Sequence, residues 1–152
     1  MKPPPSLFRA ILLLISLLIT TELYAAELNL VLVEAKNSSI SSLSPEEVRR
    51  LYLGVPVMSG GQTIKPIIND TDNLLREIFM QQVLFMSTDV YLRQTISRTY
   101  RTGEAPFPTY TDTPSLLKAL ETNPNAVTYM LEQTAVASPQ VKIITKLWHG
   151  QD

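Results

Sequence analysis

The strongest constraint on the fold is an alternation of strand-like and helical segments, each with its own boundary signals. Residues 28–34 form an apolar, β-branched run that predicts a buried strand, and 126–131 and 141–147 have the same character. Segments with apolar residues at helical spacing lie between these runs: 45–53, 74–86, 88–100 and 115–121. Such alternation is typical of α/β proteins, in which helices cover a sheet.

Residues 44–47 (Ser-Pro-Glu-Glu) carry the clearest helix start. Ser44 can accept a hydrogen bond from a first-turn N–H, and Glu47 can reach back to the Ser44 N–H, which completes a capping box. Pro45 suits the first helical position because its missing N–H would be unpaired there. Gly54 is free to adopt positive φ and is expected to end the helix.

The helix expected over 88–100 has one apolar face, which we predict to be buried: Val90, Tyr91, Thr95 and Ile96. Its arginines are expected on the opposite, polar side: Arg93, Arg98 and Arg101. Their spacing fits either a solvated helix face or a basic patch.

Residues 1–25 are predicted to be a signal peptide. Lys2 and Arg9 precede an apolar run, and small residues follow at 25–26, which is the layout of a cleaved export signal. The uncharged stretch 10–21 is shorter than the roughly 20 residues of a membrane-spanning helix. Retention as an anchor is the alternative. We expect residues 26–152 to form one domain in the periplasm.

Composition excludes several classes of function. Without Lys2, Arg9 and Glu22, 11 basic and 13 acidic residues remain, a net charge of −2, which argues against a nucleic-acid partner. The absence of cysteine excludes disulfides, thiol catalysis and Cys-based metal sites. The single histidine, His149, lies near the end of the chain, so a Ser-His-acid site is not expected. No pattern predicts a cofactor.

Three motifs carry a family resemblance. Residues 43–54 (Leu-Ser-Pro-Glu-Glu-Val-Arg-Arg-Leu-Tyr-Leu-Gly) look like the segment that opens the second lobe of periplasmic phosphate-binding proteins. Residues 124–130 (Pro-Asn-Ala-Val-Thr-Tyr-Met) resemble a Pro-Gly-Ala-Ile-Gly-Tyr-Val strand of that family, and 141–144 resemble its closing strand. The chain thus resembles a short, single-lobe form of the phosphate ABC transporter substrate-binding proteins. The resemblance implies one lobe of a type 2 periplasmic-binding-protein fold, with a mixed sheet flanked by helices.

The ligand site implied by the resemblance is altered here. In the family, a strand ends in an arginine and Ser-Gly-Thr opens the next helix, whose N–H groups hold phosphate. Asn69 takes the place of that arginine, and Asn-Leu-Leu at 73–75 replaces Ser-Gly-Thr. Asp70 and Asp72 add negative charge that opposes a bound anion. The candidate ligand-binding residues are then these, with the serine-rich loop assisting: Asn69, Thr71, Asn73, Arg76, Ser38 and Ser39.

Three functions remain open from the sequence. The first is a periplasmic binding module for a small polar or oxyanionic ligand. The second is an interaction module, a former ligand lobe that now binds a periplasmic or membrane protein, with the apolar segment 106–110 as part of its surface. The third is an enzyme that uses Asp70 and Asp72 as a metal or acid/base pair. Asp is a preferred capping residue, so we expect these two carboxylates to cap a helix and the chain to be non-catalytic.

Overall fold

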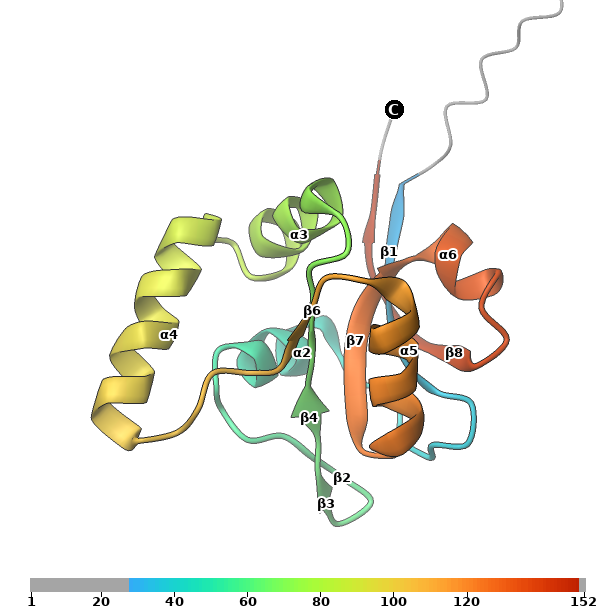
Figure 1. Cartoon of the computed structure of the whole chain (residues 1–152), viewed down its shortest axis with the longest axis horizontal. Helices are drawn as coiled ribbons and strands as arrows, with labels where there is room; N and C mark the ends of the chain where they lie inside the picture. Colours follow the sequence, from blue (N-terminus) through green and yellow to red (C-terminus); the bar gives the residue numbers. More distant parts are fainter. Residues whose placement is uncertain (1–27, 151–152) are drawn as a thin grey trace, which may run out of the picture.

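A mixed β-sheet forms the centre of the domain (Figure 1). The computed structural model describes residues 28–150, so the predicted signal peptide lies outside the described residues. The sheet has the order β4-β7-β1-β8. Strand β1 (Asn29–Ala35) pairs antiparallel with both β7 (Ala126–Leu131) and β8 (Val141–His149), while the short edge strand β4 (Lys65–Pro66) runs parallel to β7. The predicted α/β architecture, a mixed sheet flanked by helices, is confirmed.

Strand β1 is buried on both faces because helices cover each side of the sheet. Leu30 and Leu32 point into one apolar cluster, and Val31 and Val33 point into another. The first cluster lies under α2 (Pro45–Tyr52), α3 (Asn73–Ile78) and the π-helical turn η1 (Phe79–Val83). The second lies under α5 (Thr113–Thr122) and α6 (Glu132–Val136). Alternate side chains of one strand thus serve two separate cores.

Local signals determine the start of α2 and the turns near it. Ser44 and Glu47 form the predicted capping box, with Pro45 in the first turn, and Gly54 follows the helix at φ +88°. The hairpin of β2 (Met58–Ser59) and β3 (Gln62–Thr63) turns at two glycines with positive φ. A second small pair, β5 (Ile68–Asn69) with β6 (Thr109–Tyr110), is parallel.

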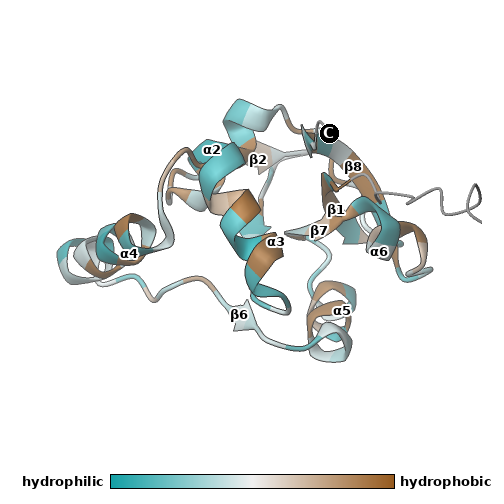
Figure 2. Ribbon diagram, turned by 90° about the horizontal axis from the view of Figure 1, so that it is seen from above, coloured by the Kyte–Doolittle hydropathy of each residue, from teal (hydrophilic) through white to brown (hydrophobic). Residues whose placement is uncertain are grey.

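Helix α4 (Thr88–Thr102) lies at one side of the domain, apart from the sheet (Figures 1 and 2). Ser87 caps its start and Gly103 ends it at φ +74°. The predicted buried face is right only in part: Tyr91 packs against the core and Thr95 is half-buried, but Ile96 is 47% exposed. Arg98, expected on the polar side, is the one buried residue of this helix. The helix thus contacts the domain along the side that carries Tyr91 and Arg98, whereas Leu92, Ile96 and Tyr100 are exposed. No helix within residues 28–150 is long and apolar enough to cross a bilayer.

Three tyrosine hydroxyls are tied to backbone carbonyls inside the domain. Tyr52 donates to the Ile67 carbonyl at 3.0 Å, Tyr129 to the Asn69 carbonyl at 2.8 Å, and Tyr91 to the Tyr52 carbonyl at 3.1 Å. Burial raises the pKa of Tyr52 and of Tyr129 well above the ordinary value and raises the pKa of Tyr91 to about 12. The folded protein therefore keeps these protons at a pH where the unfolded chain releases them.

We expect the stability of the protein to fall steeply above pH 10. Below pH 10 the folded and the unfolded protein both keep the tyrosine protons. Above it the unfolded chain binds fewer protons than the folded protein. Each such tyrosine then lowers the free energy of unfolding by about 1.4 kcal/mol per pH unit. Urea unfolding at pH 9, 10 and 11 measures the slope. Tyr91→Phe should make it shallower, whereas Tyr100→Phe, at a side chain 88% exposed, should leave it unchanged. Equal slopes in the two variants would contradict this assignment.

Candidate functional site

The predicted ligand residues around the start of α3 lie at the end of the β5 strand. Asn69 ends this strand, and α3 begins at Asn73 after the cap residue Asp72. The Asp72 side chain accepts a hydrogen bond from the Leu75 N–H at 2.9 Å. This carboxylate therefore caps the helix, as its residue type and position predict.

Asn69 is committed to the interior of the domain. Its side chain is buried, and its Nδ2 donates to the Tyr129 carbonyl at 2.9 Å. Its Oδ1 accepts from the backbone N–H of Thr71 at 3.1 Å and from the Thr71 hydroxyl at 2.7 Å. These contacts join β5 to β7 and close the turn before α3. A ligand that used Asn69 or the Thr71 hydroxyl would have to replace them.

Arg76 is paired within the same turn. Its Nη1 lies 2.9 Å from both carboxylate oxygens of Asp70, and both side chains are half-buried. This ion pair places a carboxylate of the chain itself against the guanidinium that an anionic ligand would need. Asn73 is exposed and lies one residue after the cap.

The candidate residues do not face a common cavity. Asn69 and Thr71 line a small cavity of about 220 Å³ beneath the start of α3, whereas Arg76 lines a different one of about 200 Å³ between η1 and α4. The first cavity has no basic side chain in its lining, and Asp72 is part of it. The geometry therefore offers no positively charged pocket at this helix start.

Ser38 and Ser39 lie at the opposite end of the sheet. The Ser38 hydroxyl donates to the Pro124 carbonyl, just before β7, whereas Asn69 contacts Tyr129 near the end of β7. Five residues of strand separate these contacts, roughly 17 Å at about 3.3 Å per residue. The structure thus does not bring the serine loop to the other candidate residues.

The serine loop has its own structural anchor. The buried Glu34 carboxylate at the end of β1 accepts from the Ile40 N–H at 3.0 Å and lies 3.2 Å from the Lys142 ammonium. A polar cavity of about 310 Å³ opens beside this loop, with Ser39 and Gln62 in its lining. The Glu34 carboxylate, paired with Lys142, thus holds the serine loop in place through the Ile40 N–H.

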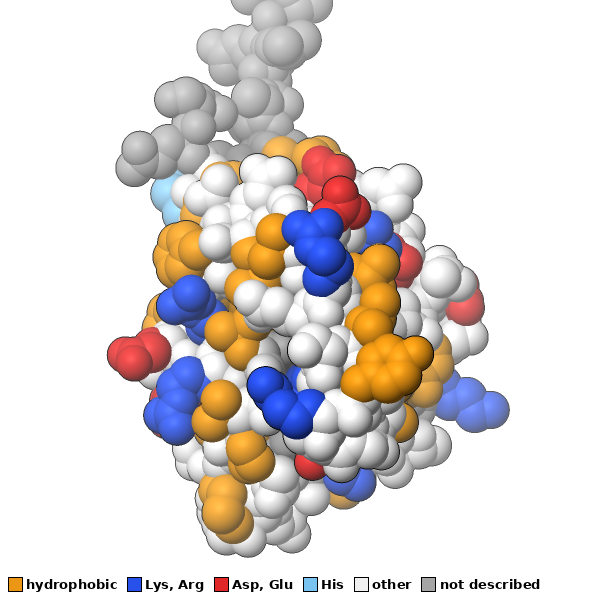
Figure 3. All heavy atoms as spheres, turned by 90° about the vertical axis from the view of Figure 1, so that its left-hand side faces the viewer, with side chains coloured by type: hydrophobic (Ala, Val, Ile, Leu, Met, Phe, Trp, Pro, Cys, Tyr) orange, Lys and Arg blue, Asp and Glu red, His pale blue; other side chains and the backbone are white. Residues whose placement is uncertain are grey.

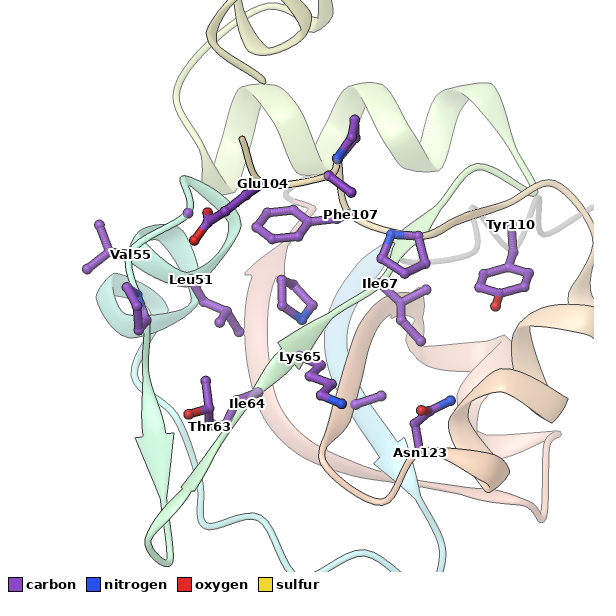
Figure 4. Close-up of a pocket in the computed structure, with 17 residues that line it drawn as sticks. Leu51, Val55, Thr63, Ile64, Lys65, Ile67, Glu104, Phe107, Tyr110 and Asn123 are labelled. Carbon is purple, nitrogen blue, oxygen red and sulfur yellow. The ribbon is translucent and has the colours of Figure 1, made fainter. Parts of the chain in front are cut away.

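An apolar groove of about 380 Å³ lies at the outer edge of β4 (Figure 4). Pro66 has no N–H to offer at this edge, and segment 104–108 crosses above it. Figure 4 shows Leu51, Val55, Glu104 and Phe107 around the opening. Phe107 is half-buried beneath the Arg98 guanidinium, whose Cζ lies 4.2 Å from the ring centroid. Segment 106–110 is therefore partly tucked against the domain.

Arg98 is the residue of potential functional interest that sequence reasoning missed. Its position among exposed residues on α4 predicts solvent, and no local signal marks it as buried. Its burial depends on tertiary contacts, because the side chain lies against Gly54. A Cβ atom at position 54 would lie 2.2 Å from Arg98 Nη1. A glycine at that position leaves the space that the arginine occupies.

The geometry does not support the alternative of a metal or acid/base site built on Asp70 and Asp72. Asp72 caps α3 as expected, whereas the expectation that Asp70 also caps a helix is wrong, because its carboxylate is paired with Arg76. Within residues 28–150, no group of three or more His, Asp or Glu side chains is placed to hold a metal ion.

Comparison with known proteins shows the fold and leaves the family open. No protein-family model matches the sequence, and no curated protein matches it. Among solved structures, it is similar to the crystal structure of an ABC-type phosphate transport receptor from Vibrio cholerae, with a TM-score of 0.57 and 17% sequence identity. The match covers 79% of this chain and 47% of the receptor, so this chain spans about half the length of that protein.

Proposed function

We propose that this chain is a non-catalytic, exported interaction module, built as a single lobe of the periplasmic-binding-protein kind, that binds a protein partner. The observation that carries the proposal is the Asp70–Arg76 ion pair, which occupies the turn where the resemblance implies an anion site. The closed hydrogen bonding of Asn69 supports it. The alternative, a receptor for a free oxyanion at this turn, would need both arrangements to open.

Electrostatics disfavour an oxyanion at the start of α3. An anion that reached Arg76 would displace Asp70 and then lie near its carboxylate. Two negative charges about 4 Å apart repel by roughly 4 kcal/mol at an effective dielectric constant of about 20. A charge-assisted hydrogen bond contributes only about 1.5–3 kcal/mol. One or two new hydrogen bonds would therefore be cancelled by the repulsion.

The outward face of α4 supports a protein partner. Leu92, Ile96 and Tyr100 are four residues apart, so they form one stripe along the helix, and their side chains are 56%, 47% and 88% exposed. Apolar anchors at this spacing are a recurrent means by which helices bind grooves in other proteins. Figure 3 shows this side of the molecule, where hydrophobic and basic side chains lie next to one another.

Two measurements test the proposal. In calorimetry with inorganic phosphate at millimolar ligand, any heat should be the same for the parent protein and for Arg76→Met, because no phosphate is expected at the start of α3. A photo-crosslinking residue in place of Ile96 should capture one defined protein in the cell envelope, whereas the same residue in place of the exposed Lys118, on α5, should not. Phosphate binding that Arg76→Met abolishes would instead favour the oxyanion receptor. Identical crosslinks from both positions would count against a specific partner surface on α4.

A further inference from the structure

The Arg98 side chain is an isolated buried cation. It is 8% exposed and lies between the backbone of Gly54 and the ring of Phe107. Its Nε and Nη2 atoms are buried without a hydrogen-bond partner, and no carboxylate of residues 28–150 lies within 4.0 Å of its nitrogens. Contact with an aromatic ring compensates only part of the lost hydration of a guanidinium. Buried charges in proteins are normally paired, so this one calls for a counter-ion.

Two more arginines share a hollow with Arg98. The hollow has a volume of about 430 Å³ and is lined by Arg93, Arg101, Gln94 and Ser97 of α4 and by Leu53 beyond α2. Arg93, Ser97 and Arg101 are four residues apart and form one row, and Gln94 and Arg98 form the adjacent row. Among residues 28–150, no acidic side chain lines the hollow. Three arginines and two neutral polar residues therefore line a space large enough for a small molecule.

We propose that this hollow binds a compact organic anion that carries at least two oxyanion groups, carboxylate or phosphate. Guanidinium groups match both oxyanions through paired N–H donors, and several such groups at one site favour a multiply charged ligand. Leu53 provides an apolar wall for the carbon part of the ligand. The site is separate from the start of α3 and goes beyond the proposed protein interaction.

Glu104 is the internal competitor for Arg98. It follows α4 after Gly103, is exposed, and lines the apolar groove next to Phe107 (Figure 4). A change of its side-chain conformation could bring its carboxylate toward Arg98. The experiment must therefore separate a bound ligand from an internal ion pair.

Citrate, with three carboxylates, and pyrophosphate, with two phosphate groups, are suitable probes at constant ionic strength. We expect citrate or pyrophosphate to shift the Arg98 Nε–Hε resonance and to give a saturable binding curve. The double variant Arg93→Gln/Arg101→Gln should weaken binding at least tenfold without changing the thermal midpoint of the free protein, because both side chains are exposed. Tighter binding of citrate would identify carboxylates as the recognised groups, and tighter binding of pyrophosphate would identify phosphate groups.

Two matched variants decide between this site and its rivals. Arg76→Gln and Glu104→Gln should each leave the affinity within about twofold of the original, well under the 1.4 kcal/mol that corresponds to a tenfold change. The proposal would be overturned if neither probe binds at about 10 mM. Equal binding by the parent and the double variant would overturn it too. Binding that appears only in Glu104→Gln would overturn it as well, since Glu104 is then the counter-ion. Binding lost in Arg76→Gln would place the anion at α3 and would contradict the proposed function instead.

Discussion

Phe79→Ala should lower the free energy of unfolding by about 3–5 kcal/mol, the largest effect that we expect from a single substitution. Phe79 is fully buried, stacks on Tyr129 with ring centroids 3.7 Å apart, and meets Tyr52 edge-on at 4.8 Å. Removing the ring would leave a cavity between the sheet and two helices. Both tyrosines would also lose an aromatic contact, which adds to the loss of buried apolar area.

Phe85→Ala is the matched control for this prediction. The same atoms are removed, but the Phe85 side chain is 70% exposed and has the Arg49 guanidinium 5.3 Å from its ring centroid. We expect a change below about 1 kcal/mol. Equilibrium unfolding in urea, followed by circular dichroism, measures both values. Similar losses in the two variants would mean that the three-ring cluster is not the centre of the core.

Gly54→Ala should destabilise the protein by about 2–5 kcal/mol. The residue has φ +88°, where any side chain is strained by roughly 1–2 kcal/mol. The new methyl group would also lie 2.2 Å from Arg98 Nη1 and 2.8 Å from its Cδ, so the arginine would have to move. Crowding of this kind in a packed region costs about 1–3 kcal/mol more. The movement would weaken the attachment of α4 to the domain.

Gly60→Ala separates backbone strain from this crowding. Gly60 also has positive φ, +57°, but a Cβ there would meet no atom within 4 Å. We expect its effect to be limited to roughly 1–2 kcal/mol of strain. Hydrogen exchange of the α4 amides provides a second measurement, because Gly54→Ala should accelerate exchange in α4 and Gly60→Ala should not. Equal exchange in both variants would argue against the contact between Gly54 and Arg98.

Local elements were predictable from the sequence because their causes are local. The capping box of Ser44 and Glu47 is formed by neighbours three residues apart, and the hairpin turn at 60–61 uses residues that tolerate positive φ. The capping role of Asp72 followed from its residue type in the same way. These signals depend on hydrogen bonds within one turn, so distant parts of the chain have little influence on them.

The candidate site was only partly predictable, since its residues depend on distant partners. The sequence pointed to Asn69 and Arg76 as ligand residues. Asn69 instead contacts Tyr129, which is 60 residues away in the chain. Arg76 is paired with Asp70, whose charge the sequence analysis considered only as repelling a bound anion. Ser38 was grouped with them although β7 separates the two sets. Spacing along the chain does not show which ends of a sheet two loops occupy.

By itself, the sequence determined the three long strands, the start of α2 and the single-lobe α/β class, because period and capping act over a few residues. Only the tertiary structure decided which side chains of α4 are buried. Its apolar stripe faces outward and Arg98 faces inward, since Gly54 and Phe107 together form the space that receives a guanidinium. Burial depends on the shape of the surface opposite the helix, and residues remote in the chain build that surface.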